Sequence, residues 1–181
     1  AEKMVLLYPV FDALSKAVAA DEQKNEDLLS LANTRARLRM VTLYYYAACK
    51  RYLVAGTGNK VEDFGVGFYT KYGDGGVDLS PIADLSKTQV RALASTLGVD
   101  QKILNAPPTD GLWDDGRNDE EQLDATYEQL EWAMTQHAAG KSPADFVGEN
   151  ARVFEVFLSH HNANKHKMDP IPVCSIPKQL L

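Results

Sequence analysis

Hydrophobic residues recur at intervals of three and four along most of the chain, and this spacing predicts amphipathic helices. Such helices are expected at residues 9–20, from 26 to about 48, at 87–97, at 120–139 and from 146 to 158. Two short apolar runs, at residues 4–8 and 52–55, predict buried strands instead. Strands that alternate with helices indicate an α/β protein, entered midway through a βαβ series.

Helix breakers and capping residues locate the ends of several elements. Ser86 can cap the helix expected at 87–97, and Gly98 follows that helix. We also expect an extended piece at 81–83 and a short turn at 101–104. A break at 140–143 should precede the next helix, which Ser142 and Asp145 can cap, and residues 170–181 should form an irregular tail.

The composition is that of an ordinary globular chain. Its 181 residues are 45% hydrophobic and 24% charged, with a formal net charge of −6, and this length suits one domain with a substantial core. Because there is no basic run to neutralise phosphates, we expect no nucleic-acid partner. We also expect no membrane association and a cytoplasmic location, since the chain shows neither a bilayer-spanning run nor a signal peptide. Cys49 and Cys174 lack metal-ligand spacing and are expected to be free thiols.

Residues 54–87 carry most of the candidate chemistry. A Gly-Thr-Gly-Asn turn follows the strand predicted at 52–55, and glycines let a backbone approach a phosphate closely. The carboxylate of Glu62 suits a divalent cation, while Lys71 and Lys87 can meet anionic oxygens. Taken alone, a glycine turn with nearby charges is more typical of a solvated surface loop.

Three motifs in this stretch follow one another in a fixed order: Gly-Thr-Gly-Asn-Lys, Phe-Tyr-Thr-Lys-Tyr-Gly-Asp-Gly and Asp-Leu-Ser-Pro. In that order they resemble NAD synthetases, the enzymes that amidate nicotinic acid adenine dinucleotide (deamido-NAD). An Asn-x-x-Ala-Arg-x-Arg-Met segment at 33–40 and a His-Lys pair at 166–167 are similar to segments of the same family. The resemblance extends over about residues 8–170.

The resemblance assigns candidate site residues to three ligands. Thr57, Lys87 and Thr109 correspond to ATP contacts, and Glu62 corresponds to a Mg²⁺ ligand. The positions that correspond to deamido-NAD contacts are Arg37, Lys71, Asp78, His166 and Lys167. The resemblance therefore makes Lys87 and Glu62 the catalytic pair, since Lys87, and Glu62 together with Mg²⁺, would offset the negative charge on the phosphates.

Two departures from the family pattern stand close to these residues. Met168 occupies a position where the family usually has arginine. One residue more than in the simplest bacterial pattern separates Glu62 from the Phe-Tyr-Thr-Lys segment. This extra residue predicts a small bulge and leaves the register of residues 63–67 open.

The resemblance implies a single NAD synthetase domain over residues 1–181, with a three-layer, Rossmann-like α/β fold around a parallel sheet. The family's Ser-Gly-Gly-x-Asp-Ser loop, which cradles pyrophosphate, does not occur in these residues. We therefore expect an N-terminally incomplete domain, the C-terminal two-thirds of a synthetase, that is poorly soluble and cannot complete catalysis. Family members are homodimers, and residues 43–48 and 123–134 are candidate dimer surfaces.

The reaction implied by the resemblance is ATP-dependent amidation of deamido-NAD with ammonia, through an adenylate, with release of AMP and pyrophosphate. Because no glutaminase pattern is visible, the ammonia-dependent form is expected. Two alternatives stay open. One is another amide ligase of the ATP-pyrophosphatase group, against which the Phe-Tyr-Thr-Lys-Tyr-Gly-Asp-Gly segment argues. The other is an inactive fragment or paralogue that binds deamido-NAD or dimerises with an intact synthetase.

Three further groups of residues have simpler interpretations. The acidic segment at 114–121 is expected to be a mobile loop rather than a metal site. The tyrosines at 44–46 are expected to pack into the core or a subunit interface. The histidines His160, His161 and His166 have no cysteine near them and lack zinc-site spacing.

Overall fold

The computed structural model describes residues 3–19, 28–113 and 115–180. Its elements are α1 (Tyr8–Ala19), α2 (Leu28–Lys50), η1 (Val61–Val66), α3 (Lys87–Thr96), α4 (Gln101–Leu104), α5 (Asp119–Leu123), α6 (Tyr127–Ala138), η2 (Pro143–Asp145), α7 (Gly148–Met168) and η3 (Lys178–Leu180). Of these, η1 is a π-helix, whereas η2 and η3 are 3₁₀-helices.

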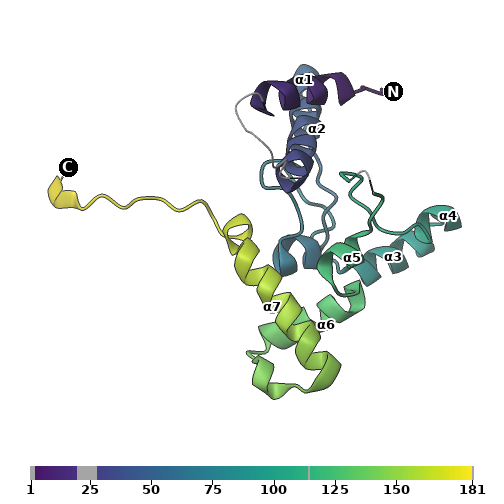
Figure 1. The fold of residues 1–181 in the computed structure, drawn as a ribbon, viewed down its shortest axis with the longest axis vertical. Coiled ribbons are helices and arrows are strands. Elements are labelled where there is room, and N and C mark those ends of the chain that lie inside the picture. The colour runs from purple at the N-terminus through teal and green to yellow at the C-terminus, as the bar shows by residue number, and fades with distance from the viewer. Residues whose placement is uncertain (1–2, 20–27, 114, 181) are drawn as a thin grey trace.

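The helices are arranged in an open cluster (Figure 1). α1 crosses α2 at one end of the molecule, and α6 and α7 lie side by side at the other. α3 and α4 extend to one side, and the chain after α7 runs outward as an extended tail to η3 (Figure 1). The irregular tail predicted for 170–181 is confirmed as far as residue 177.

The main apolar core is shared by α6, α7 and η1. Val153, Phe154 and Phe157 recur at helical spacing on α7 and pack in one cluster with Leu130 of α6 and Val66 of η1. None of the five is more than 2% exposed, and burying a side chain of this size contributes about 1.5–3 kcal/mol. The core therefore fixes η1, the element on which Glu62 stands.

Where a small bulge is predicted after Glu62, the structure has a single π-helical segment, η1. A π-helix bonds each N–H one residue further back than an α-helix, so it accommodates one extra residue. The segment ends at Gly67, whose φ of 64° is left-handed, and a Cβ there would lie 2.5 Å from the Cβ of Asn164. Asn164 Nδ2 donates to the Val66 carbonyl at 2.8 Å, so α7 holds the end of η1 in place.

Most of the predicted helices are confirmed. Those expected at 9–20, 26–48 and 87–97 correspond to α1, α2 and α3, although residues 20–27 lie outside the described part of the chain. The short turn at 101–104 is α4. Ser86 caps α3 by accepting from the Gln89 N–H, and Gly98 follows the helix with φ 75°. Cys49 and Cys174 are both free and exposed, as expected.

The single helix predicted at 120–139 is wrong, because two helices occupy that segment. Asp124 adopts a left-handed φ of 54° and ends α5. Thr126 then starts α6, accepting from the Gln129 N–H while the Gln129 side chain accepts from the Thr126 N–H. Such a Thr-x-x-Gln capping box is a local helix start that outweighs the continuous apolar stripe.

The predicted strands are not formed in the described residues. Residues 4–7 belong to no regular element and Tyr8 already starts α1, so a strand at 4–8 is wrong. In the run at 52–55 only Ala55 pairs, through an isolated parallel bridge to Leu79. Residues 81–83 form a turn rather than an extended piece. A parallel pair is rarely stable without further strands beside it, so the described residues hold a bridge and no parallel sheet.

Replacing the cap of α6 tests this account of the broken helix. Thr126→Ala removes a side-chain acceptor for the Gln129 N–H and should lower the free energy of unfolding by about 1 kcal/mol, measured by urea denaturation. Thr135→Ala is the matched control, because its hydroxyl donates only to the Glu131 carbonyl within the same helix and such bonds add little. Equal effects of the two substitutions would contradict the capping role.

Candidate functional site

Glu62 and Lys87, the predicted catalytic pair, are in direct contact. Lys87 Nζ lies 3.0 Å from Glu62 Oε1, and the two side chains are only 23% and 13% exposed. Lys87 is the first residue of α3, directly after the Ser86 cap, whereas Glu62 stands on η1. The side chains of the two residues therefore meet at the point where η1 and the start of α3 come together.

A buried tyrosine joins this pair to a second carboxylate. Tyr127, at the start of α6, is 0% exposed, and its hydroxyl lies 2.5 Å from Glu62 Oε1 and 3.1 Å from Asp119 Oδ2. The Lys87 ammonium also lies over the Tyr127 ring, 4.7 Å from its centroid, which favours its positive charge there. Burial, together with the charges of Glu62 and Asp119, raises the pKa of Tyr127. Burial also raises the pKa of Asp119, which the Tyr127 hydrogen bond partly offsets.

The predicted ATP and metal residues line one cavity of about 430 Å³. It is bounded by the loop after α2, by η1, by the start of α3 and by the loop that precedes α5. Its lining includes the predicted site residues Thr57, Glu62, Lys87 and Thr109, and also Asp119. The fold thus brings together residues that lie more than fifty positions apart in sequence.

Two arginines of α2 hold the loop that carries Thr109. Arg35 Nη1 donates to the Leu112 carbonyl at 2.6 Å, and Arg39 donates to the carbonyls of Asp110 and Gly111 at 3.0 and 2.8 Å. Alternate arginines leave a helix in different directions, yet in this structure both reach the same loop. Their role is to fasten one wall of the cavity.

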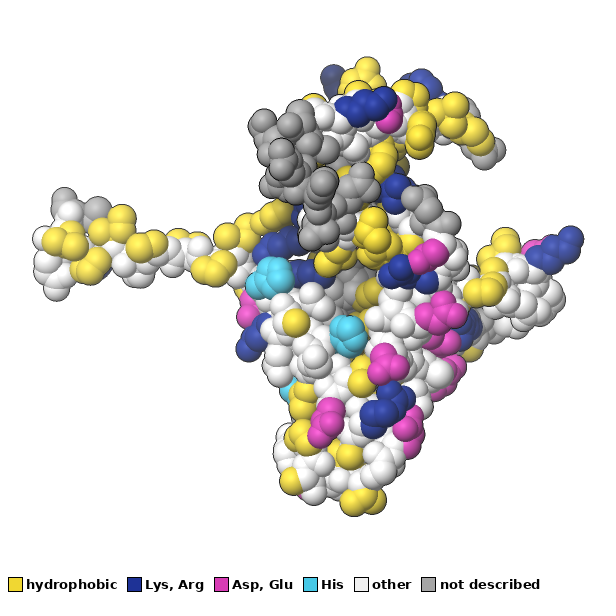
Figure 2. Space-filling model, in the orientation of Figure 1, with side chains coloured by type: hydrophobic (Ala, Val, Ile, Leu, Met, Phe, Trp, Pro, Cys, Tyr) yellow, Lys and Arg dark blue, Asp and Glu magenta, His cyan; other side chains and the backbone are white. Residues whose placement is uncertain are grey.

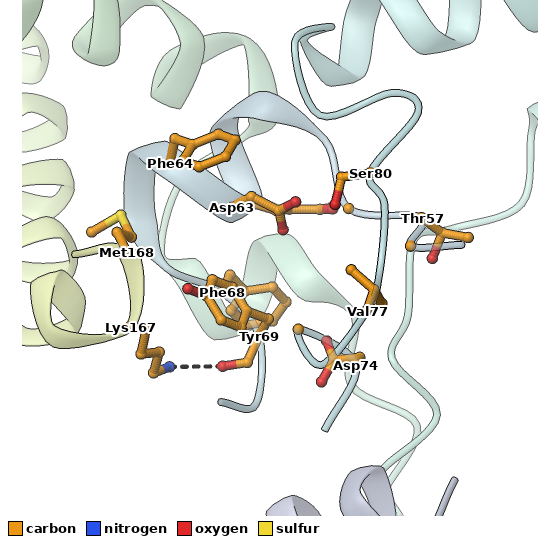
Figure 3. Close-up of a pocket in the computed structure, with 14 residues that line it drawn as sticks. Thr57, Asp63, Phe64, Phe68, Tyr69, Asp74, Val77, Ser80, Lys167 and Met168 are labelled. Carbon is orange, nitrogen blue, oxygen red and sulfur yellow. Dashed lines mark hydrogen bonds between the residues drawn. The ribbon is translucent and has the colours of Figure 1, made fainter. Parts of the chain in front are cut away.

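Four of the predicted deamido-NAD residues form a second group. Arg37 donates to the Lys71 carbonyl through Nε and Nη2, both at 3.3 Å, and Lys71 Nζ donates to the His166 carbonyl at 2.5 Å. Lys167 Nζ donates to the carbonyls of Gly67 and Tyr69 at 2.9 and 2.8 Å, the latter contact being drawn in Figure 3. These side chains link α2, the loop after η1 and the end of α7.

Asp78, the fifth predicted deamido-NAD residue, has a different environment. Its carboxylate accepts from the Val54 N–H at 2.8 Å and from the Tyr44 hydroxyl at 3.1 Å. Asp78 is not among the described lining residues of the first cavity or of the smaller cavity described next. In this structure Asp78 therefore ties the segment at 52–55 to α2. Tyr45, next to Tyr44, is 64% exposed and does not enter the core.

A smaller cavity of about 240 Å³ lies beside the first (Figure 3). Its walls include Thr57 and Lys167 together with the carboxylates of Asp63 and Asp74. Burial and the charges of Glu62 and Asp74 raise the pKa of Asp63 to about 6. Burial lowers the pKa of Lys167, an effect that the nearby charge of Asp74 opposes. Asp74 is itself held by the Thr70 N–H at 2.9 Å.

Sequence reasoning missed Asp119 and Tyr127. The segment at 114–121 was expected to be a mobile acidic loop, but residues 119–121 belong to α5, and Asp119 is 6% exposed. The available signal was the pair of capping boxes, Asn-x-x-Glu at 118–121 and Thr-x-x-Gln at 126–129. They predict two helix starts, which bring Asp119 and Tyr127 to the same end of adjacent short helices.

The histidines contact backbone carbonyls. His160 Nε2 lies 3.2 Å from the Leu123 carbonyl, and His161 Nδ1 lies 2.6 Å from that of Gly65. Within the described residues, no group of three or more His, Cys, Asp or Glu side chains is placed to hold a metal ion. The helices of that same part of the chain include none that is both long and apolar enough to cross a membrane.

The chain belongs to the NAD synthase family, whose model matches residues 3–170. An NH₃-dependent NAD⁺ synthetase of Alkaliphilus metalliredigens is 46% identical over 167 residues, which are 92% of this chain and 63% of that protein. One of Carboxydothermus hydrogenoformans is 42% identical over 137 residues, 76% of this chain and 56% of that protein. The chain thus spans little more than half the length of the curated relatives it matches.

Two solved structures are similar over most of the chain. The NMN synthetase of Francisella tularensis superposes with a TM-score of 0.80 at 31% identity, covering 96% of this chain and 66% of that one. The NAD⁺ synthetase of Burkholderia pseudomallei gives 0.60 at 32% identity, covering 89% and 57%.

Asp63→Asn tests the electrostatics of the smaller cavity. The pKa of Asp63 is raised from 3.8 to about 6 in the folded protein, so the folded state binds the proton more tightly than the unfolded state. The stability that this group contributes is present below pH 4 and is lost as the pH rises through 6. Asp63→Asn should therefore be more stable than wild type at pH 7.5, by about 1 kcal/mol after allowance for partial exposure.

Urea denaturation at pH 4, 6 and 7.5 measures this difference, which should disappear at the lowest pH. Asp84→Asn is the control, because the Asp84 side chain is 97% exposed. A gain for Asp63→Asn that is the same at all three pH values would contradict a titrating carboxyl.

Proposed function

We propose that this chain is part of an ammonia-dependent NAD synthetase, which amidates deamido-NAD to NAD in an ATP-dependent reaction. The observation that carries the proposal is the single cavity that Thr57, Lys87 and Thr109 share with Glu62. Membership of the NAD synthase family supports it independently. The nearby curated relatives bear the name NH₃-dependent NAD⁺ synthetase.

The proposed chemistry has two balanced steps. A carboxylate oxygen of the nicotinate attacks the α-phosphorus of ATP, and pyrophosphate leaves to give an acyl adenylate. Ammonia then attacks the activated carbonyl carbon, AMP leaves with the bonding electrons, and the amide nitrogen loses a proton. Both steps bring anions together, so the protein acts mainly through positioning and charge compensation.

Lys87 would compensate the negative charge of the phosphates directly, and Glu62 would do so through a bound Mg²⁺ ion. The Lys87 ammonium, now paired with Glu62 at 3.0 Å, can turn to phosphate oxygens when a nucleotide enters the cavity. Tyr127 holds Glu62 when Lys87 leaves. The Glu62 carboxylate fits a Mg²⁺ ion, which would neutralise phosphate charge when bound.

The deamido-NAD half of the proposal rests on the second group of residues. Arg37, Lys71 and Lys167 place three cations within one region, and arginine and lysine suit the phosphates of a dinucleotide. Their present carbonyl partners are neutral, so a phosphate would be the stronger partner. His166 and Asp78 complete the set proposed from the family pattern.

A second candidate substrate is the mononucleotide, nicotinic acid mononucleotide. The observation in its favour is the TM-score of 0.80 to a protein named NMN synthetase, against 0.60 for a NAD⁺ synthetase at nearly the same identity. The bonds formed and broken at the carboxyl group would be the same. Only the contacts to the adenylate half of the dinucleotide would differ.

Several features of the whole protein are proposed with this function. They are a three-layer α/β fold in which the segments of Ala55 and Leu79 join a parallel sheet, a homodimer, and use of free ammonia. Exposed apolar residues on α2, among them Val41, Leu43 and Tyr45, are suited to the dimer contact. Because the 181 residues contain no Ser-Gly-Gly-x-Asp-Ser loop, we also propose that they do not complete the reaction by themselves.

The activity test uses the full-length protein with ATP, Mg²⁺ and ammonium, and measures the amidated product and AMP by chromatography. Lys87→Met should lower kcat by about 100-fold or more, since it removes a charge that acts on the phosphates in the transition state. Lys102→Met, on α4 and away from both cavities, is the control and should keep wild-type activity. Equal activity of the two variants would overturn the role of Lys87.

Parallel assays with deamido-NAD and with the mononucleotide decide between the two substrates. The proposed function predicts the larger kcat/KM for deamido-NAD. A larger value for the mononucleotide would replace it with the second candidate, and the absence of AMP formation with either substrate would overturn both.

A further inference from the structure

Asp119 is buried in an environment that its protein partners do not satisfy. The residue is 6% exposed, and Oδ2 accepts from the Tyr127 hydroxyl at 3.1 Å. The other oxygen, Oδ1, is buried with no hydrogen-bond partner. A buried carboxylate oxygen without a partner is costly, and native structures rarely keep one without a reason.

The local helix does not supply that reason. Asn118 caps α5 by accepting from the Glu121 N–H at 2.9 Å, and Glu121 returns the bond by accepting from the Asn118 N–H at 3.0 Å. Asp119 takes no part in this capping box. Its carboxylate instead belongs to the wall of the larger cavity, together with Glu62 and Lys87.

The charges around the two carboxylates are unbalanced. Lys87 contacts Glu62 Oε1, but no ion pair to Asp119 occurs among the described residues. Tyr127 has a single hydroxyl hydrogen, yet it contacts both Glu62 and Asp119. Two adjacent carboxylates with one bound ammonium leave room for a further positive charge.

We propose that Asp119 is a second carboxylate ligand of the divalent cation that Glu62 would hold, with Tyr127 as the positioning residue that sets the spacing of the two. The inference extends the site of the proposed function and rests on it for the identity of the cation. One or two carboxylates completed by water and substrate phosphates form a common Mg²⁺ site. Rotation about the last side-chain bond of Asp119, a soft torsion, turns Oδ1 toward the cavity while α5 stays in place.

The position of Tyr127 explains why a tyrosine is used. Its ring lies under the Lys87 ammonium, and its hydroxyl reaches both carboxylates from the buried side. The hydroxyl therefore links the two carboxylates, and the ring packs against the ammonium that pairs with one of them. A phenylalanine would keep the ring and lose only the hydroxyl.

Binding of Mn²⁺ to the full-length protein tests the proposal, with free Mn²⁺ measured by electron paramagnetic resonance in the absence of substrates. Asp119→Asn should raise the Kd about tenfold or more, because the amide lacks the negative charge. Asp124→Asn is the matched control at the other end of α5: its side chain is 80% exposed and it pairs with Arg152, so its Kd should stay within twofold of wild type. Tyr127→Phe should give a smaller increase, about threefold to fivefold.

A double variant tests whether the two carboxylates act on the same ion. If one ion uses both carboxylates, Glu62→Gln combined with Asp119→Asn should weaken binding little more than the stronger single variant. Thermal unfolding of each variant checks that the fold is retained. Additive losses, an unchanged Kd for Asp119→Asn, or no Mn²⁺ binding by the wild type would each overturn the proposal. Because no substrate is present, Mn²⁺ binding without amidation would separate failure of the proposed function from failure of this inference.

Discussion

The hydrogen bond from the Tyr127 hydroxyl to Glu62 joins the apolar core to the polar site. Tyr127 begins α6, whose next turns carry core residues such as Leu130, so its position is set by packing. Its hydroxyl then holds a carboxylate that burial alone would disfavour. Without this bond, Glu62 would keep only the Asn59 N–H at 3.4 Å and Lys87, and a nucleotide would compete for that lysine.

The loops around the site are held by a different kind of interaction. Long cationic side chains reach backbone carbonyls in four places: Arg35 and Arg39 at 110–112, Arg37 at residue 71, Lys71 at residue 166 and Lys167 at residues 67 and 69. Most of these bonds lie at the surface. Segments held mainly by exposed polar contacts open more readily than a packed core. The site therefore combines a rigid floor, built from η1 and α6, with adjustable walls.

Features encoded by local contacts could be predicted from the sequence. α1, α2 and α3 follow from apolar spacing, and Ser86 with Gly98 marks the limits of α3. Thr57, Lys87 and Thr109, predicted as ATP contacts, and Glu62, predicted as a metal ligand, line one cavity; their roles stay predictions. The apolar run at 52–55 predicted a strand that does not form in the described residues, because a strand exists only through its neighbours and Ala55 has one bridge partner. Asp119 was missed because its burial depends on Tyr127, which belongs to a different helix.

The π-helix has a consequence for the side chains that follow it. Adding a residue to an α-helix would rotate every later side chain by about 100°, since 3.6 residues complete a turn. A π-helical turn holds more residues than an α-helical turn, and η1 ends at Gly67, where Asn164 packs and donates to the Val66 carbonyl. The length of this segment can therefore change while the chain before it and the chain after it keep their positions. Glu62 near the start of η1 and the Thr-Lys-Tyr-Gly segment after it thus keep their separate partners, and the length of chain between them can change at little cost to either.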